Sequence, residues 1–504
     1  VLQGERKLIK QHSEMLGITE VSVCLIVFLL IAQFLKLQWR CSRLPPGPTP
    51  LPIIGNLLLL DFKLHRDNLV KLTNIYGNIY TVWMGETPIV ILNGFQAVKD
   101  GVVSHSEEIS GRPLSPFYRD MMGNKGIFLT SGHTWKQQRR FVMTFLRSLA
   151  LGKRTLEHRI QEEARHMVEV FASHKGKLFD PHIHMIHAIA NVICSVSFGH
   201  RFSSEDDSFN RLIKAISSVV YFNATTWGRL YDVFPWVMHY LPGPHQKVFA
   251  YNDFMHNLVR NEIRSHEERW KADDPQDFID LYLDQIAKTK DDPTSTFNED
   301  NMVQSVVDLL VGGTETTTTS LCWALLYMLQ YPDIQEKVQK ELETVLEPSQ
   351  LIYYEDRNKL PYTNAVIHET LRYSNITAVG TFRQCVKDTA VLGVPIEKNT
   401  IVLPNLHSVV FDSEHWETPG KFNPNHFLDS DGNFVNNEAF FPFSAGHRVC
   451  LGEQMAKTEL FIFFVTLLRA FTFQLPEGVK EANMDYILGV ILQPHPYKLH
   501  AIPR

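Results

Sequence analysis

Cysteine is scarce in this sequence, and its spacing is irregular. Six cysteines occur among 504 residues, and no two of them form a Cys-x-x-Cys pair. This scarcity excludes a dense disulfide framework and favours a reducing compartment. Positive charge is not in excess either, because 49 Lys and Arg stand against 55 Asp and Glu, which gives a net charge of −6. The overall charge therefore gives no indication of nucleic-acid binding.

Several further features are missing. The chain has no internal repeat, no linker that would divide it into several domains, and no Gly-x-Gly-x-x-Gly fingerprint of a dinucleotide-binding fold. A composition that is 44% hydrophobic is nevertheless ample to bury a large core. We therefore expect one large catalytic domain over residues 57–504, with no nucleotide-binding module of its own.

The single long hydrophobic run lies near the N-terminus. Leu16 to Leu37 is nearly all apolar, and as a helix at 1.5 Å per residue it spans about 33 Å, enough for a bilayer core. A cleaved signal peptide is the alternative, but the end of the run lacks the small-residue cleavage pattern. We predict a retained single-pass anchor with its flank over residues 1–43. Basic residues precede and follow the run equally, so only the cysteine usage indicates that the bulk of the chain faces the cytosol.

Residues 44–56 contain five prolines, at positions 45, 46, 48, 50 and 52. Proline forbids a helix here and favours a stiff extended segment, which we expect to be a hinge between anchor and catalytic domain. An ordinary proline-rich surface loop is the alternative. Short β-branched runs at 79–84, 88–92 and 401–403 predict small sheets, and most of 95–375 has a helical pattern. The expected fold class is mainly α, an α+β arrangement with small sheets.

The strongest chemical signal surrounds Cys450. Residues 443–452 read Phe-Ser-Ala-Gly-His-Arg-Val-Cys-Leu-Gly, and a helical pattern follows at once. A cysteine at the start of a helix lies among unpaired N–H groups that stabilise a thiolate, the form that binds metal. Gly446 and Gly452 would let the backbone approach a flat ligand closely. An inert buried cysteine is the alternative, and a zinc site with His447 lacks a second pair of ligands.

Two further segments carry weaker signals. Residues 312–317 read Gly-Gly-Thr-Glu-Thr-Thr within a helix predicted from about 299 to 330. Two interior glycines reduce the helix propensity of this segment by about 2 kcal/mol, so the helix needs either tertiary support or a functional reason for the glycines. Small residues can open a groove beside the helix, and a threonine hydroxyl can hydrogen-bond back to the helix backbone. Glu315 and Thr316 then form an acid–alcohol pair for proton relay. Glu369 and Arg372 share a helix face, although a surface ion pair explains them equally well in isolation.

Together these segments resemble the cytochromes P-450. The motif around Cys450 matches the family's Phe-x-x-Gly-x-Arg-x-Cys-x-Gly at every fixed position, residues 312–317 resemble the oxygen-binding motif, and Glu369 with Arg372 resembles the Glu-x-x-Arg pair. His426 stands where a third arginine is often found. The resemblance extends from the anchor to the C-terminus and is closest to microsomal family 2, especially the J subfamily. His447 and Gly312 depart from the residues usual at those positions.

The resemblance implies a haem-thiolate monooxygenase. It places haem b on Cys450, with the propionates held by Trp135, Arg139, Arg112, Arg383 and Arg448. It also implies electrons from NADPH through a separate reductase, cytochrome b5 as a possible second partner, and an endoplasmic-reticulum membrane with the catalytic domain in the cytosol. A haem-thiolate hydroperoxide isomerase and a non-catalytic haem or steroid binder are the rivals.

By the same resemblance, the substrate pocket is formed by apolar and mostly small residues: Phe117, Phe128, Asp308, Leu309, Gly312, Ile376, Thr377, Ala378, Val379 and Val490. We expect hydroxylation and epoxidation of polyunsaturated fatty acids such as arachidonate, together with oxidation of xenobiotics. Arg119 or Lys125 are candidates for binding a carboxylate at the pocket mouth, although exposed cations are common. A basic patch is expected to bind the reductase, and it comprises Lys136, Arg139, Arg140, Arg147, Lys153 and Arg154.

Overall fold

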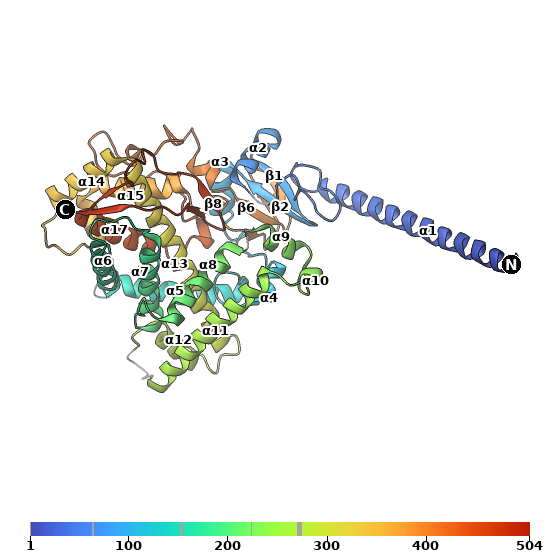
Figure 1. Cartoon of the computed structure of the whole chain (residues 1–504), viewed down its shortest axis with the longest axis horizontal. Coiled ribbons are helices and arrows are strands. Elements are labelled where there is room, and N and C mark those ends of the chain that lie inside the picture. The colour runs from blue at the N-terminus through green and yellow to red at the C-terminus, as the bar shows by residue number, and fades with distance from the viewer. Residues whose placement is uncertain (1, 63–64, 152–154, 223, 270–274) are drawn as a thin grey trace.

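The structure is a computed structural model that describes residues 2–62, 65–151, 155–222, 224–269 and 275–504. Lys153 and Arg154 of the expected basic patch lie outside the described residues. The helices dominate and the sheets are small, so the predicted fold class is confirmed (Figure 1).

The first helix, α1 (Leu2–Cys41), projects away from the remainder of the molecule (Figure 1). Its segment Glu20–Cys41 is long and apolar enough to cross a membrane, with a mean hydropathy of 2.2 over its most apolar window. The last turns contact the globular part, because Gln33 Nε2 donates to Glu86 Oε1 at 2.5 Å and Arg40 Nη1 donates to the Glu86 carbonyl at 3.1 Å. An apolar helix suited to anchor the chain is therefore present, as expected.

The proline-rich segment lies along the first strand and is hydrogen-bonded to it. Thr81 N donates to the Pro46 carbonyl at 2.8 Å, and Trp83 N donates to Asn56 Oδ1 at 2.8 Å. Gly47 is required at this contact, since a Cβ there would lie 1.9 Å from the Thr81 carbonyl oxygen. The segment joins the anchor to the sheet at a fixed place.

The largest sheet has the order β1-β2-β6-β3, formed by β1 (Ile79–Met84), β2 (Thr87–Leu92), β6 (Ile401–Pro404) and β3 (Arg383–Gln384). β1 and β2 form an antiparallel hairpin, and β6 joins β2 in parallel, with Ile89 opposite Ile401. Three two-stranded sheets complete the β structure: β4 (Thr389–Val391) with β5 (Val394–Ile396), β7 (Phe471–Gln474) with β10 (His500–Pro503), and β8 (Tyr486–Leu488) with β9 (Leu492–Pro494).

The remaining α-helices are α2 (Arg66–Tyr76), α3 (Gly94–Lys99), α4 (Pro116–Met122), α5 (Gly132–Leu151), α6 (Thr155–Ser173), α7 (His182–Phe198), α8 (Asp207–Phe222), α9 (Thr226–Val233), α10 (Pro235–Met238), α11 (Pro244–Arg269), α12 (Phe278–Lys288), α13 (Glu299–Gln330), α14 (Pro332–Val345), α15 (Pro361–Ser374), α16 (His407–Val410) and α17 (Glu453–Ala470).

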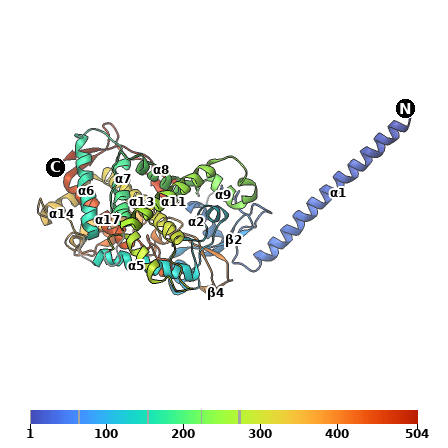
Figure 2. The same ribbon diagram turned by 90° about the horizontal axis from the view of Figure 1, so that it is seen from below.

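Helix α13 runs through the centre of the helical part, among α7, α8, α11 and α17 (Figure 2). It begins after Asn298, whose side chain accepts the Asn301 N–H at 2.9 Å, and it ends before Pro332, which opens α14. Its stretch from Leu321 to Leu329 is buried on every side and shares one hydrophobic core with the apolar run Phe461–Phe464 of α17, the helix that α13 packs against. This packing supplies the tertiary support that the weak Gly-Gly-Thr segment requires.

Candidate functional site

The loop before α17 holds Cys450 in a fixed position. Cys450 N donates to the Phe443 carbonyl at 3.0 Å, and Gly446 has a φ of 70°. A Cβ on Gly446 would lie 1.7 Å from the Val102 carbonyl oxygen, so only glycine fits. Part of the Cys450 side chain is accessible to solvent, although protein surrounds the residue. The thiol therefore faces a space inside the protein.

The electrostatics of Cys450 differ from the simple helix-start argument. Burial raises the pKa of the thiol, and the Gly452 N–H, which lowers it, does not compensate fully. Helix α17 begins only at Glu453, whose carboxylate also raises the Cys450 pKa. The surroundings of Cys450 alone therefore favour the neutral thiol, and a metal ion held by Cys450 would keep the sulfur in the thiolate form.

Four arginines converge beside this loop, and we call them the arginine cluster: Arg112, Arg139, Arg383 and Arg448. Arg139 Nη2 donates to the Val449 carbonyl at 2.7 Å, next to Cys450. Arg448 donates to the Ser110 and Thr130 carbonyls at 2.6 and 2.7 Å and stacks on the buried Trp135 ring at 3.9 Å. Arg383 Nη2 donates to Ser444 Oγ at 2.9 Å, and Arg112 donates to the Phe382 carbonyl. The structure thus brings together every predicted propionate residue.

The arginine cluster has more positive charge than its surroundings neutralise. Burial, together with repulsion from other cluster members, lowers the pKa of Arg383 to about 9 and that of Arg448 to about 8. Arg112 Nε and two nitrogens of Arg383 are buried without a hydrogen-bond partner, and no carboxylate among the described residues forms an ion pair with the cluster. Buried cations without counter-charge are costly, so a dianionic group such as the two propionates of haem fits here.

The Gly-Gly-Thr segment of α13 gives its two glycines different surroundings. A Cβ on Gly312 would meet no atom within 4 Å, whereas a Cβ on Gly313 would lie 2.6 Å from Ile193 of α7. Thr316 Oγ1 donates back to the Gly312 carbonyl at 2.6 Å. Gly312 therefore borders open space, Gly313 allows close helix packing, and the Thr316 hydroxyl occupies a backbone acceptor of α13 as the sequence predicted.

Glu315 points toward α8 and β9. Its carboxylate accepts hydrogen bonds from Ser217 Oγ and, at 3.0 Å, from Gln493 Nε2. Burial raises the pKa of Glu315. A relay with Thr316 stays a prediction, and it requires Glu315 to release these two partners.

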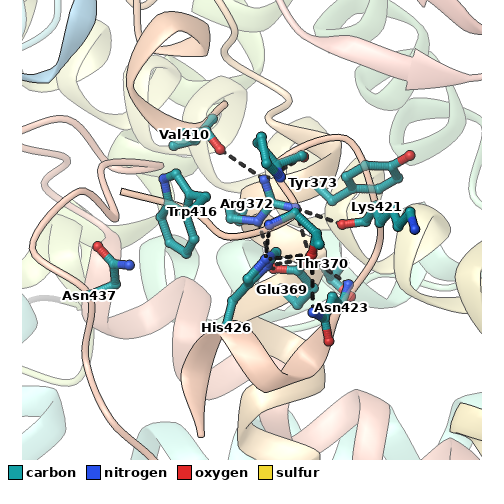
Figure 3. Close-up of polar contacts among 12 residues, drawn as sticks. Glu369, Thr370, Arg372, Tyr373, Val410, Trp416, Lys421, Asn423, His426 and Asn437 are labelled. Carbon is teal, nitrogen blue, oxygen red and sulfur yellow. Dashed lines mark hydrogen bonds and ion pairs between the residues drawn. The ribbon is translucent and has the colours of Figure 1, made fainter. Parts of the chain in front are cut away.

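Glu369 and Arg372 form a buried pair and not a surface one (Figure 3). Arg372 Nε and Nη2 donate to the two Glu369 oxygens at 2.7 and 2.8 Å, a bidentate geometry. His426 Nδ1 lies 3.2 Å from both Glu369 oxygens, so it occupies the place expected for a third member. The remaining Arg372 donors reach the carbonyls of Val410, Pro419 and Lys421. This pair ties α15 to the segment that leads to the Cys450 loop.

A cavity of about 440 Å³ adjoins the arginine cluster through Arg112. The predicted pocket residues that line it are Phe128, Ile376, Ala378, Val379 and Val490. Leu309, Gly312 and Thr377 are not part of its wall, and Thr377 Oγ1 lies 3.4 Å from the Pro442 carbonyl.

Two predicted pocket residues have other surroundings. Phe117 is fully buried and packs on Phe222 and Tyr231, with ring centroids 4.8 and 5.7 Å away, so its neighbour Tyr118 forms the cavity wall instead. Asp308 accepts the N–H groups of Ile127 and Phe128 at 2.7 and 2.9 Å. Burial raises the pKa of Asp308 to about 6. Its carboxylate positions the loop that carries Phe128.

The sequence argument missed Glu459, the acidic residue at the start of the apolar run of α17. Glu459 is buried, its one side-chain hydrogen-bond partner among the described residues is Thr317 of α13 at 3.1 Å, and burial raises its pKa to about 8. A lone carboxyl directly before the six consecutive apolar residues Leu460–Val465 was the available signal. Also missed was Arg229 in the cavity wall, for which the sequence offers no local signal.

Comparisons with known proteins agree with this geometry. The family model described as cytochrome P-450 matches residues 45–501. Human cytochrome P-450 2J2 is 42% identical over 479 residues, 95% of each chain, and mouse cytochrome P-450 2J5 is 40% identical over 491 residues, 97% of each chain. Mouse cytochrome P-450 2F2 is 40% identical over 461 residues, 91% of this chain and 94% of its own. Because the model spans nearly all of the globular part and the relatives match almost end to end, the chain belongs to the cytochrome P-450 family of haem-thiolate monooxygenases, which use NADPH through a reductase.

Proposed function

We propose that the chain hydroxylates and epoxidises polyunsaturated fatty acids such as arachidonate, and also oxidises xenobiotics. The observation that carries the proposal is the cavity of about 440 Å³ with mainly apolar walls beside the arginine cluster. Burial at about 25 cal/mol per Å² retains long or varied apolar molecules. A methylene is worth only about 1–3 kcal/mol in such a pocket, so its walls impose weak selectivity.

Haem fits the residues that would hold it, namely Cys450 as ligand and the arginine cluster with Trp135 around the propionates. When bound, haem supplies oxygen activation tuned by its thiolate ligand. Residues of α13 provide space for the reaction and groups for proton delivery. Gly312 leaves space on α13, Thr316 presents a hydroxyl there, and Glu315 is the nearest acid along the helix for proton delivery.

The substrate proposal is tested with enzyme reconstituted with NADPH and the flavoprotein reductase. Arachidonate, its saturated analogue and a drug-like probe are incubated separately, and the products are identified by mass spectrometry. We expect epoxides and hydroxy acids from arachidonate and hydroxy acids alone from the saturated acid. Turnover of the drug-like probe without any product from either acid would contradict the fatty-acid assignment.

We also propose that α1 anchors the chain in the endoplasmic-reticulum membrane and that the catalytic domain lies in the cytosol. Apolar surface near the anchored end supports this arrangement. Trp236 of α10 and the nearby Tyr240 are 71% and 81% exposed, and α10 lies at the same end of the globular part as α1 (Figure 1). Aromatic side chains of this kind favour the membrane–water interface.

We further propose that the reductase, and cytochrome b5 where it takes part, binds the basic face of α5. Lys136, Arg140 and Arg147 are exposed along that helix, and Arg139 lies between this face and the Cys450 loop. Opposite charge on a partner would accelerate association at low salt.

Charge reversal tests this docking face. Lys136→Glu with Arg140→Glu should slow the first electron transfer by about tenfold at low ionic strength, and salt should reduce the difference because it screens exposed charges. Substrate affinity should not change. Lys340→Glu, an exposed reversal on α14, is the control. Equal transfer rates for mutant and parent at every salt concentration would exclude the α5 face.

A further inference from the structure

The cavity contains an arginine whose donors are unused. Arg229 of α9 lies in its wall, and protein surrounds the guanidinium. Arg229 Nε is buried without a hydrogen-bond partner, and no hydrogen bond or ion pair of its guanidinium occurs within the part of the chain that the structure describes. Burial lowers its pKa. Because an arginine carries five N–H donors in a rigid fork, this arrangement is costly unless a ligand fills it.

The other cations considered for this role have partners or lie on the surface. Lys125 Nζ binds Asp300 at 2.6 Å. Arg66, also in the cavity wall, pairs with Asp67 at 3.6 Å and stacks on the Tyr486 ring at 4.5 Å. Arg119 is exposed, and its side chain makes one long hydrogen bond with the described residues, 3.5 Å to the Leu114 carbonyl. Among these side chains Arg229 alone is partly buried and makes no side-chain hydrogen bond or ion pair with the described residues.

The local fold fixes Arg229 in place. Helix α9 begins after Thr225, whose hydroxyl accepts the Gly228 N–H at 3.1 Å, and its fully buried Tyr231 donates to Asp120 at 2.7 Å. One turn beyond Arg229, Asp232 attracts the guanidinium electrostatically, but its Oδ1 already accepts the Phe117 N–H at 3.0 Å. Asp232 thus moderates the positive charge without occupying the donors of Arg229.

We propose that Arg229 is a carboxylate-binding residue of the substrate cavity, and that it anchors the charged end of a long apolar acid while the chain extends along the apolar wall. A planar guanidinium matches a carboxylate bidentately. The cavity also borders Arg112 of the arginine cluster. An acid held at Arg229 therefore presents a limited range of its carbons for oxidation. This proposal rests on the function proposed above and names how that site selects its substrates.

The test compares each acid with its methyl ester, which lacks the negative charge and adds one methyl group. Dissociation constants are measured from the haem absorbance shift for arachidonic acid, an aryl-propionic acid drug and both methyl esters. The proteins are the full-length haem-loaded parent and the variants Arg229→Leu, Arg229→Lys, Arg119→Leu and Arg264→Leu. Arg264 is an exposed residue of α11 and serves as the matched control.

In the parent, we expect each acid to bind more tightly than its ester. Arg229→Leu should weaken acid binding by about 10- to 100-fold, the range for a lost charge-assisted hydrogen-bonded contact, and leave ester binding unchanged. Arg229→Lys should be intermediate, because it keeps the charge and loses the fork. Arg264→Leu should match the parent. Product positions from arachidonate should become more dispersed in Arg229→Leu.

Equal affinity for acid and ester in the parent would contradict the proposed role of Arg229 in binding the carboxylate. Loss of acid binding in Arg119→Leu but not in Arg229→Leu would contradict it as well. If Arg229→Leu loses haem, Arg229→Lys and the parent acid–ester difference still decide the question. Failure of the fatty-acid function is a separate outcome, in which arachidonate gives no product while the aryl-propionic acid still binds more tightly than its ester through Arg229.

Discussion

Two groups of buried arginines lie within the same domain, and their hydrogen bonds differ. All three nitrogens of Arg372 donate to partners within the chain, two of them to Glu369. The arginine cluster around the Cys450 loop has no carboxylate partner among the described residues, and Arg383 leaves two nitrogens unpaired. Arg372 finds all its acceptors within the chain, whereas Arg112 and Arg383, for which we propose a role in holding haem, keep buried nitrogens unpaired. Arg229 follows the second pattern.

The largest effect should come from breaking the buried Glu369–Arg372 ion pair. Arg372→Leu leaves the Glu369 carboxylate buried without its counter-ion, which costs about 3–5 kcal/mol, a large share of a typical total stability of about 5–15 kcal/mol. We expect almost no haem-loaded protein, measured by the reduced carbon monoxide spectrum. Lys99→Ala, which breaks the exposed Lys99–Glu438 pair at 3.0 Å, should change stability by less than about 1 kcal/mol. Normal haem content in Arg372→Leu would contradict the comparison.

A smaller effect should distinguish the well-paired carboxyl of Glu369 from that of Glu459. Burial raises the folded-state pKa of Glu459 from 4.5 to about 8, so the folded state binds this proton more tightly than the unfolded state. Stability therefore falls as pH rises through about 8. Integrating from pH 6 to 8 gives a loss of about 2 kcal/mol from this residue.

Glu459→Gln should remove that loss. Urea unfolding at pH 6 and 8 should show a smaller decrease for the variant than for the parent. The variant should already be the more stable protein at pH 6, because the parent carboxyl is neutral in the folded state there but ionised in the unfolded state. An identical decrease in both proteins would mean that Glu459 does not titrate in this range.

The smallest effect should come from the arginine cluster, and its two readouts should have opposite signs. Arg383→Leu removes a repelled guanidinium with unpaired nitrogens, so the haem-extracted protein should gain about 1 kcal/mol. Haem should dissociate about tenfold faster from the loaded variant, because one propionate partner is lost. Transfer of haem to an acceptor globin measures that rate. If both the extracted and the loaded forms became less stable, Arg383 would belong with Arg372 as a structural residue.

Sequence reasoning succeeded where a short segment determines the outcome. β1 has the predicted bounds, α13 ends before Pro332 as predicted, and Thr316 bonds to Gly312 four residues earlier. It was less successful where the partner is distant in sequence. The Glu315 partners Ser217 and Gln493 are 98 and 178 residues away. Whether Phe117 or Tyr118 faces the cavity depends on how α4 packs against α9, which no local pattern encodes.

If α1 anchors the chain as proposed, the contact between the end of α1 and Glu86 links the lipid phase to the catalytic domain. Glu86 lies in the β1–β2 turn, between Met84 and Thr87, and both of these residues form part of the cavity wall. In the membrane arrangement proposed above, the cavity wall is therefore fixed near the point where the chain would leave the bilayer. A lipophilic substrate is concentrated in that bilayer, so the enzyme samples the mole fraction of substrate in lipid and not its total concentration. Adding substrate-free vesicles at constant total substrate dilutes it within the membrane, and the apparent KM rises in proportion to the lipid.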